Sequence, residues 1–457
     1  IIEKDKVISE LLVRLENLER ENWRLADRVL ELEERLAKYE TPKNSRNSSI
    51  PPSRDENRPK KNQSLRKPTN RKVGGQPGRK GKTLEMVTNP DKIVELHPVY
   101  CSSCGNSLKN IEGVKGGSRQ IVDIPPIKAL YTEYRLFTKQ CSCGCQNRAD
   151  FPKHVNAPIG YGPRLEGFVG YFHARQYLPF ARMQEMFNDV FNINISEGGI
   201  HRLLKRFADK TTSIYDLIGQ RVSYSPVVGT DETGVKVNGD KHWMWTWQTR
   251  HLTYIAHSDN RGKATIDAHF PEGFAKATLL HDAWRAQSAT PAKHHQTCIA
   301  HLLRHLNYLN EKYKKDTWAT DFTKLLCRAL EFNERFDGQD DNYIAERNKI
   351  VCSLSEQLDS PPEKNKKELF TFYKRMCRDR QQLLVFLFIE NVPPDNNASE
   401  RAIRNIKVKQ KISGQFKNPR YAQNFAKIRS VIDTTIKNGM NVIDALNLIA
   451  KFEFQLN

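Results

Sequence analysis

The stretch VVGTDETGVKV, residues 227–237, predicts a β-strand with carboxylates in its middle, because apolar β-branched residues flank the acids. Gly229 and Gly234 bracket the two acids. Successive side chains of a strand point to opposite faces, so Asp231 and Glu232 face opposite ways and only one can join a given site. We take Asp231 as the candidate metal ligand, although a solvent-facing strand acid would show the same pattern.

The sequence after this strand continues as strands and then changes to a helix. The expected elements are strands at 242–248, 252–257 and 276–282 and a helix at 263–270. The fourth strand ends at Asp282, which places that acid on the rim of the sheet. Antiparallel strands, a helix and a fourth strand ending in an acid give the order of a ribonuclease-H-like domain, whose first part we place at residues 223–292. Three Trp residues of the second strand could stack bases, but a buried sheet face is the commoner explanation.

Residues 293–392 have mainly helical patterns and are predicted to form an insertion in that domain. The expected helices are 294–313, 317–336, 343–359 and 364–389. Within the first of them, Cys298, His301 and His305 have a spacing that could suggest a metal site. Histidine pairs of this spacing without a third ligand are more often structural or phosphate contacts.

The last part of the predicted domain, residues 393–413, contains a helix start. Proline followed by Asp-Asn-Asn marks the N-terminus, and Glu400 lies on the first turn. A metal-binding acid beside cations suits a phosphodiester, although Asn397 and Glu400 also have the spacing of a capping box. Residues 414–457 are predicted to form a C-terminal helical region. The cations that follow Glu400 are Arg401, Arg404, Lys407 and Lys411.

Three acids, Asp231, Asp282 and Glu400, can together support phosphodiester cleavage. That reaction needs an activated attacking oxygen and a neutralised leaving oxygen, and two Mg²⁺ (or Mn²⁺) ions held by carboxylates supply both. We therefore expect these three acids to be the catalytic metal ligands. Glu232 and Asp259 are weaker candidates, because the first faces away and the second lies in an expected turn.

The charge of the chain favours a polyanionic partner. Lys and Arg number 73 against 53 Asp and Glu, so the net charge is +20. Residues 41–90 are rich in proline and basic residues and predict a disordered linker. Its end includes Arg79 and Lys80 among glycines, which suits contact with DNA, although a merely solvated linker fits equally well.

Residues 1–40 predict one helix with an unbroken heptad register. Leucine at most d positions and a single polar Asn22 at an a position favour a parallel two-stranded coiled coil, so we expect a homodimer through residues 8–39. A helix packed on the body of the same protein would have a broader apolar stripe. The a positions are Ile8, Leu15, Asn22, Val29 and Leu36, and the d positions are Leu11, Leu18, Leu25, Leu32 and Tyr39.

Five of the nine cysteines cluster between residues 101 and 145 and predict a zinc-binding domain at 91–158. The first pair is unambiguous, whereas the second pair has alternatives. We favour Cys143 over Cys145, because Cys143-Gly144 repeats the Cys-Gly pattern of the first pair; His154 is a further substitute, and reduced thiols without metal also fit. The predicted structural Zn²⁺ ligands are Cys101, Cys104, Cys141 and Cys143.

Residues 159–222 predict a helical region with a helix-turn-helix pattern. Two short helices and a tight turn precede a third helix that Ser196 would cap. An ordinary helical layer under the catalytic domain gives a similar pattern. The candidate DNA-contacting residues of the third helix are Glu197, His201, Arg202, Lys205 and Arg206.

The joint order of these motifs resembles the insertion sequence 66 family of bacterial transposases. The similar segments are GGQPGRKG, the CxxCG pair, CSCG, ISEGGIHRLLKR, GTDETGVKV, HDAW, CIAHLLRHL and DNNASERAIR, and they span nearly the whole chain. The resemblance implies a DDE transposase on a ribonuclease-H-like fold with a helical insertion, a zinc-binding domain and accessory proteins encoded by the same element. Carried over by position, its triad is Asp231, Asp282 and Glu400. The additional Cys145 departs from the pattern.

A protein of this kind would bind double-stranded DNA, namely transposon terminal repeats and target DNA, cut at the element's end and join the freed 3′-hydroxyl. Two other classes fit the same features: a DNA-binding regulator or architectural protein with an inert domain, and a structure-specific nuclease that does not join. No signal peptide is seen, and the longest apolar run, 383–389, is too short to span a bilayer. We therefore expect no membrane partner and a cytoplasmic, nucleoid-associated location in a bacterium.

Overall fold

The computed structural model has mixed α+β architecture, which confirms the expected class in its broad form. The chain divides into two compact units, one comprising Ile1–Arg58 with Tyr131–Asn457 and the other comprising Pro59–Leu130. Each unit is considered by itself. The residues that the structure describes are 2–40, 42–44, 47–48, 55–57, 84–152, 155–314, 316–334 and 340–451.

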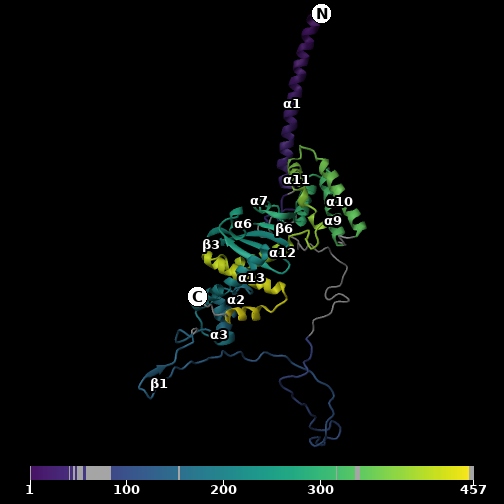
Figure 1. Ribbon diagram of the computed structural model, residues 1–457. Helices are drawn as coiled ribbons and strands as arrows, with labels where there is room; N and C mark the ends of the chain where they lie inside the picture. Colours follow the sequence, from purple (N-terminus) through teal and green to yellow (C-terminus); the bar gives the residue numbers. More distant parts are fainter. Residues whose placement is uncertain are drawn as a thin grey trace. The chain divides into compact units, whose positions relative to one another are not determined.

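A five-stranded sheet organises the larger unit (Figure 1). Across the sheet the order is β5-β4-β3-β6-β7, so β3 is the middle strand. β3 pairs antiparallel with β4 and parallel with β6, while β5 and β7 complete the two edges. The strands are β3 (Val227–Val237), β4 (Asp240–Gln248), β5 (Thr253–Ser258), β6 (Phe274–His281) and β7 (Ala292–Thr297).

The first part of the sheet agrees closely with the sequence pattern. β3 covers the expected residues, and β4, β5, β6 and the helix α6 (Lys263–His269) lie within two residues of their expected bounds. Trp245 and Trp247 are fully buried and stack on each other, with ring centres 5.7 Å apart. The buried-face explanation is therefore confirmed for these two rings, and base stacking by them is excluded.

The predicted helix from residue 294 is wrong at its start, because Ala292–Thr297 forms β7 and the helix α8 (Ile299–Lys312) begins later. The segment carries no strand-like alternation of its own, and pairing with β6 decides its structure. The predicted helix 364–389 is also too long. α11 (Lys367–Arg378) ends early, since residues 383–387 are all buried and a regular helix would turn some of them towards solvent.

The helices after β7 form a second hydrophobic core of their own (Figure 1). Its members come from α8, α11 and two further long helices, together with one short 3₁₀ turn and residues beside it. This arrangement suits an inserted helical layer. The remaining elements are α9 (Trp318–Asn333), α10 (Asp341–Asp359), η1 (Arg380–Gln382) and η2 (Val385–Leu387).

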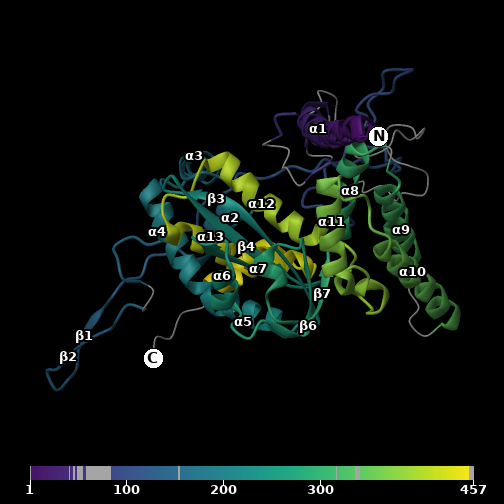
Figure 2. The same ribbon diagram turned by 90° about the horizontal axis from the view of Figure 1, so that it is seen from above.

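Helices from the end of the chain return to the sheet and cover it (Figure 2). α12 (Asn397–Ser413) packs along β3 and β4, whereas α13 (Pro419–Lys437) and α5 (Thr212–Ser223) pack on β5. The chain therefore brings Glu400, on the first turn of α12, back to the strand that carries Asp231. The last described helix, α14 (Val442–Lys451), packs on α2 (Pro163–Ala174).

Three helices, which the sequence predicts, precede α5 and the sheet. They are α2, α3 (Phe180–Phe191) and α4 (Glu197–Lys210). Asn192, in the left-handed region at φ 51°, ends α3. The Ser196 hydroxyl accepts a hydrogen bond of 3.1 Å from the backbone N–H of Gly199, which confirms Ser196 as the N-cap of α4.

α1 (Ile2–Glu40) is one continuous helix, as the heptads predict. Five of its a and d leucines, at positions 15, 18, 25, 32 and 36, are between 47% and 58% exposed in the single chain. Exposed leucines in heptad register favour a second helix as partner, so the homodimer stays a prediction. Among the described residues, no helix combines the length and apolar character needed to cross a bilayer.

Candidate active site

Asp231 lies in the middle of β3, where its carboxylate is poorly compensated. Its Oδ1 accepts a hydrogen bond of 2.8 Å from the backbone N–H of Glu232. Burial raises the pKa of Asp231 well above its usual value, and the carboxylates of Asp282 and Glu232 raise it further. A buried carboxylate repelled by other carboxylates is stabilised when a cation binds beside it.

Asp282 directly follows β6 and contacts a histidine from the start of α8. Its Oδ1 lies 3.0 Å from Nδ1 of His301, and the same nitrogen lies 3.4 Å from Sγ of the buried Cys298. Burial lowers the pKa of His301, but hydrogen bonds to Asp282 and Cys298 outweigh this and raise the pKa to about 10. His301 is therefore a cation at neutral pH, beside one of the three acids.

Glu400 completes the group from α12. Its Oε1 lies 2.8 Å from Arg304 and 3.8 Å from Nε2 of His301. Burial alone would raise the pKa of Glu400, but the charges of Arg304, His301 and Arg404 lower it. The side chain thus faces cations, and the backbone N–H of Asn397 donates to Asp395 at 2.9 Å. The capping-box explanation of Glu400 is therefore wrong.

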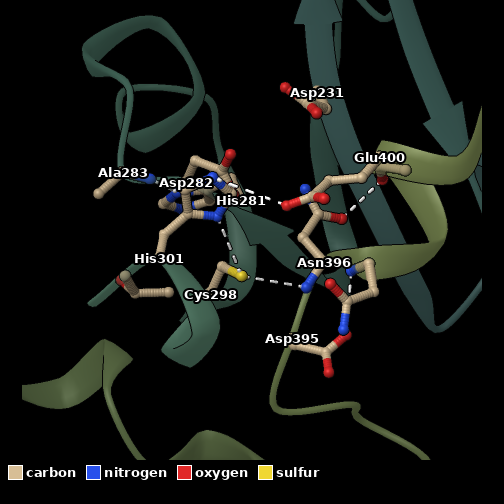
Figure 3. Close-up of polar contacts among 12 residues, drawn as sticks. Asp231, His281, Asp282, Ala283, Cys298, His301, Asp395, Asn396 and Glu400 are labelled. Atoms are coloured by element: carbon tan, nitrogen blue, oxygen red, sulfur yellow. Dashed lines mark hydrogen bonds and ion pairs between the residues drawn. The ribbon is translucent and has the colours of Figure 1, made fainter. Parts of the chain in front are cut away.

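The three acids form what we call the acidic cluster: Asp231, Asp282 and Glu400 (Figure 3). They come from a mid-strand position, a strand end and a helix start, and each interacts with the charge of His301. The sequence singled out His301 only within the Cys298, His301 and His305 spacing, for which a structural or phosphate-contact role was preferred, and it did not single out Arg304.

The donor atoms around the acidic cluster suit two different kinds of metal. In the part of the chain that the structure describes, the three residues whose ligand atoms all lie within 4.8 Å of one another are Asp282, Cys298 and His301. Sulfur and nitrogen ligands suit softer metals than Mg²⁺. Carboxylate oxygens, such as those of the acidic cluster, suit hard divalent cations such as Mg²⁺.

In contrast, both carboxylate oxygens of Glu232, the neighbour of Asp231, accept hydrogen bonds from other side chains. Its side chain is 4% exposed, and its Oε1 accepts bonds of 2.9 and 2.7 Å from Arg261. Its Oε2 accepts a bond of 2.8 Å from Gln287. Both oxygens are occupied by the protein itself, so Glu232 has a structural environment.

A chain of hydrogen bonds attaches α12 to the strand that carries Asp231. Asn396 donates from Nδ2 to the carbonyl of Thr230 at 2.8 Å and accepts at Oδ1 from the Ser399 hydroxyl at 2.6 Å. Gln248 donates to that hydroxyl at 2.9 Å, and Lys437 donates to Gln248 at 2.9 Å. We call Asn396, Ser399, Gln248 and Lys437 the support chain. Sequence analysis used the Asp-Asn-Asn motif only as a helix start and missed this role.

The residues predicted to contact DNA have different surroundings. Arg202 and Lys205 of α4 are exposed, and the His201 ring packs 4.8 Å from that of Tyr421. Arg206 is already paired with the buried Glu166. Arg401 and Arg404 are exposed on α12, beside Glu400. Two further predicted contacts, Arg79 and Lys80, lie outside the described residues, as does His154.

Each cysteine pair, taken by itself, forms a tight turn that lowers a thiol pKa. At the first, the backbone N–H groups of Cys104 and Ser103 and the Cys104 side chain lower the pKa of Cys101. At the second, between β1 (Thr138–Gln140) and β2 (Gln146–Arg148), the backbone and side chain of Cys143 lower the pKa of Cys141. Gly105 and Gly144 close the turns with φ of 74° and 84°. The thiolate is the form that binds metal, and a lowered pKa favours it.

Comparison with known proteins links this site to one family. A family model described as Transposase IS66 family matches residues 159–424, which include the whole sheet and the acidic cluster. A second model, described as a family of unknown function (DUF6444), matches residues 3–85. No curated protein matches the chain.

Proposed function

The chain belongs to the IS66 family of transposases, and from that premise we propose that it cuts DNA at the ends of its element and joins the freed 3′-hydroxyl to target DNA. The observation that carries the proposal is the acidic cluster. Three carboxylates from distant parts of the sequence surround His301, and burial and mutual repulsion leave Asp231 in need of a cation.

We propose a ribonuclease-H-like fold for the catalytic domain. The support is the sheet order β5-β4-β3-β6-β7, with three antiparallel strands followed by two parallel ones. In this arrangement the acid of the middle strand and the acid after the fourth strand belong to neighbouring strands. The helical insertion then separates them in sequence from Glu400.

Asp231, Asp282 and Glu400 would hold Mg²⁺ or Mn²⁺, which activates water and neutralises the leaving oxygen in phosphodiester cleavage. The protein's own cations prepare this site. His301 lies against Asp282 and Arg304 against Glu400, and these contacts orient the two carboxylates. The positive charge of His301 and Arg304 also attracts the phosphate of a DNA strand to the acids.

Other parts of the chain would hold the DNA. The net charge of +20 supports nucleic acid as partner. We assign phosphate contacts to the exposed Arg202, Lys205, Arg401 and Arg404, and we propose a homodimer through α1. Structural Zn²⁺ bound by the cysteine turns is a further proposal, supported by the lowered thiol pKa in each turn. Zinc content per chain, measured by mass spectrometry, tests it.

The decisive experiment uses the purified full chain, Mg²⁺ and labelled duplexes carrying the ends of the element. Wild-type protein is expected to cut at the end and to produce joined strands, whereas Asp282→Asn should do neither. Full activity of the variant would refute the metal-ligand assignment. Binding without cleavage would favour a regulator, and cleavage without joining would favour a nuclease.

A further inference from the structure

A stack of alternating cations and aromatic rings runs from β4 to Trp284, which follows Asp282 of the acidic cluster by two residues. The Lys241 amine lies 4.8 Å from the centre of the Trp243 ring. On the same ring, the guanidinium carbon of Arg261 lies at 4.7 Å, and it also lies 3.8 Å from the centre of the Trp284 ring. Arg261 therefore contacts two indoles, and Trp284 is the last ring of the series among the described residues.

The chain holds the end of this stack close to Asp282. Trp284 is two residues beyond that acid, and Ala283 between them has a left-handed φ of 60°. A non-glycine residue is strained in this region, so the surrounding structure must enforce the turn. The Ala283 N–H donates to His281 at 3.0 Å, and Glu232 fixes Arg261 with two hydrogen bonds. The surrounding structure thus fixes the positions of both Trp284 and Arg261.

Packing alone does not explain Trp284. Burial of a large aromatic ring is favourable, and Trp245 and Trp247 of the same sheet are fully buried. Trp284 instead remains 40% exposed, although it lies next to a proposed metal centre. An exposed ring beside cations is the kind of surface on which nucleobases stack.

We propose that Trp284 is a stacking platform for an unpaired nucleobase of the DNA end, next to the acidic cluster. The inference rests on the proposed function. Stacking on the open side of the ring would continue the Lys–Trp–Arg–Trp series by one aromatic layer. A base held there would keep the adjoining phosphodiester at the acids. Because every base has an aromatic face, the platform should tolerate any base, but it requires the base to be unpaired.

Photo-crosslinking tests this contact directly. The probe is a duplex with a short single-stranded tail that contains 5-iodouracil, a base that crosslinks to stacked aromatic side chains on irradiation. Peptide mapping of the wild-type protein should place the crosslink on Trp284. In a parallel titration, Trp284→Ala should bind the tailed duplex about tenfold more weakly than wild type. Its affinity for a fully paired duplex should change far less.

Two further variants separate stacking from folding. Trp284→Tyr keeps an aromatic ring and should retain most of the affinity, whereas Tyr224→Ala removes an exposed ring elsewhere and should have no effect. Crosslinks only at other residues, or equal loss with tailed and paired duplexes, would overturn the platform. Neither result touches the proposed function, which fails instead if the wild-type protein shows no Mg²⁺-dependent cleavage.

Discussion

The acidic cluster and the support chain both include residues at the contact between α12 and β3, yet the protein satisfies the polar groups of the two to different extents. In the support chain each amide and hydroxyl has partners within the protein, from Thr230 through Asn396 to Lys437. In the acidic cluster, Asp231 is buried next to another carboxylate, and its pKa is raised as a result.

This difference separates groups that hold the structure from groups available for chemistry. A saturated network fixes geometry, because every displaced member would leave a buried polar group without a partner. A buried carboxylate without such partners is stabilised when a cation binds beside it. The same contrast appears within β3, where Glu232 is saturated by Arg261 and its neighbour Asp231 is not.

The largest effect is expected when the acids lose their charge. Asp231→Asn and Asp282→Asn preserve side-chain size but remove the ligand charge, so cleavage with Mg²⁺ should fall by about a thousandfold or more. Cleavage rates of labelled end DNA under single-turnover conditions measure this. Asp259→Asn, at an exposed position outside the cluster, serves as the control and should cut at the wild-type rate. Comparable rates for all three variants would show that the charge of the acidic cluster is not required for cleavage.

A smaller loss should follow when the support chain is broken. Asn396→Ala removes the bond to the Thr230 carbonyl, which fixes α12 next to Asp231. Residues that orient metal ligands typically contribute about 10–100-fold to metal affinity or activity. We expect a loss of this size, with a higher Mg²⁺ concentration needed for half-maximal cleavage.

The Mg²⁺ titration distinguishes positioning from simple destabilisation. Asn397→Ala, one residue further along α12, is the matched control and should leave the Mg²⁺ requirement unchanged. If Asn396→Ala lowers the unfolding temperature but cuts with the wild-type Mg²⁺ requirement, Asn396 has only a structural role.

The two regions also differ in how far sequence predicts them. The three acids were predicted from local patterns: Asp231 in mid-strand, Asp282 at a strand end and Glu400 on a first helical turn. Each acid was recognised from its neighbours in the sequence, and the family resemblance gave the order of the three. The strand β7 was missed, since its polar residues adopt that structure only through pairing with β6.

The support chain was missed for a related reason. Asn396 and Gln248 lie far apart in sequence, and nothing in their local patterns predicts that a shared hydroxyl will connect them. His301 was given less weight than the acids, because a lone histidine pair is more often structural. Only the fold brings it against Asp282 at 3.0 Å.

Gly229 tests how closely β3 and α12 pack against each other. A Cβ there would lie 2.8 Å from Oδ1 of Asn396 and 3.0 Å from the Ser399 hydroxyl. Gly229→Ala should therefore displace α12 and lower the free energy of unfolding by about 1–3 kcal/mol. Urea unfolding measures this change.

The same strand supplies the control. A Cβ at Gly234 meets its nearest atom at 3.7 Å, an ordinary contact, so Gly234→Ala should change stability by well under the loss at position 229. Equal effects of the two substitutions would indicate that strand glycine itself, and not the fit of the support chain, is responsible.

The smallest effect concerns the charge at the far end of the support chain. Lys437 donates to Gln248 and to the carbonyls of Thr249 and Leu252 at 2.9, 2.8 and 2.7 Å, and burial lowers its pKa from 10.5 to about 8. Between these values the unfolded chain binds more protons than the folded protein. Stability from this residue is therefore lowest below pH 8 and rises as the pH increases towards 10.5.

Lys437→Met removes this titration. The difference in unfolding free energy between wild type and variant should therefore shift in favour of wild type by about 1–3 kcal/mol as the pH rises across that window. Urea unfolding at several pH values measures it, and Lys427→Met, at a partly buried position on α13, is the matched control for the loss of a lysine. A constant difference would mean that Lys437 keeps its proton when folded. The hydrogen bonds of the support chain would then stabilise the Lys437 ammonium as well as water does, and the contrast with the poorly compensated Asp231 would be larger.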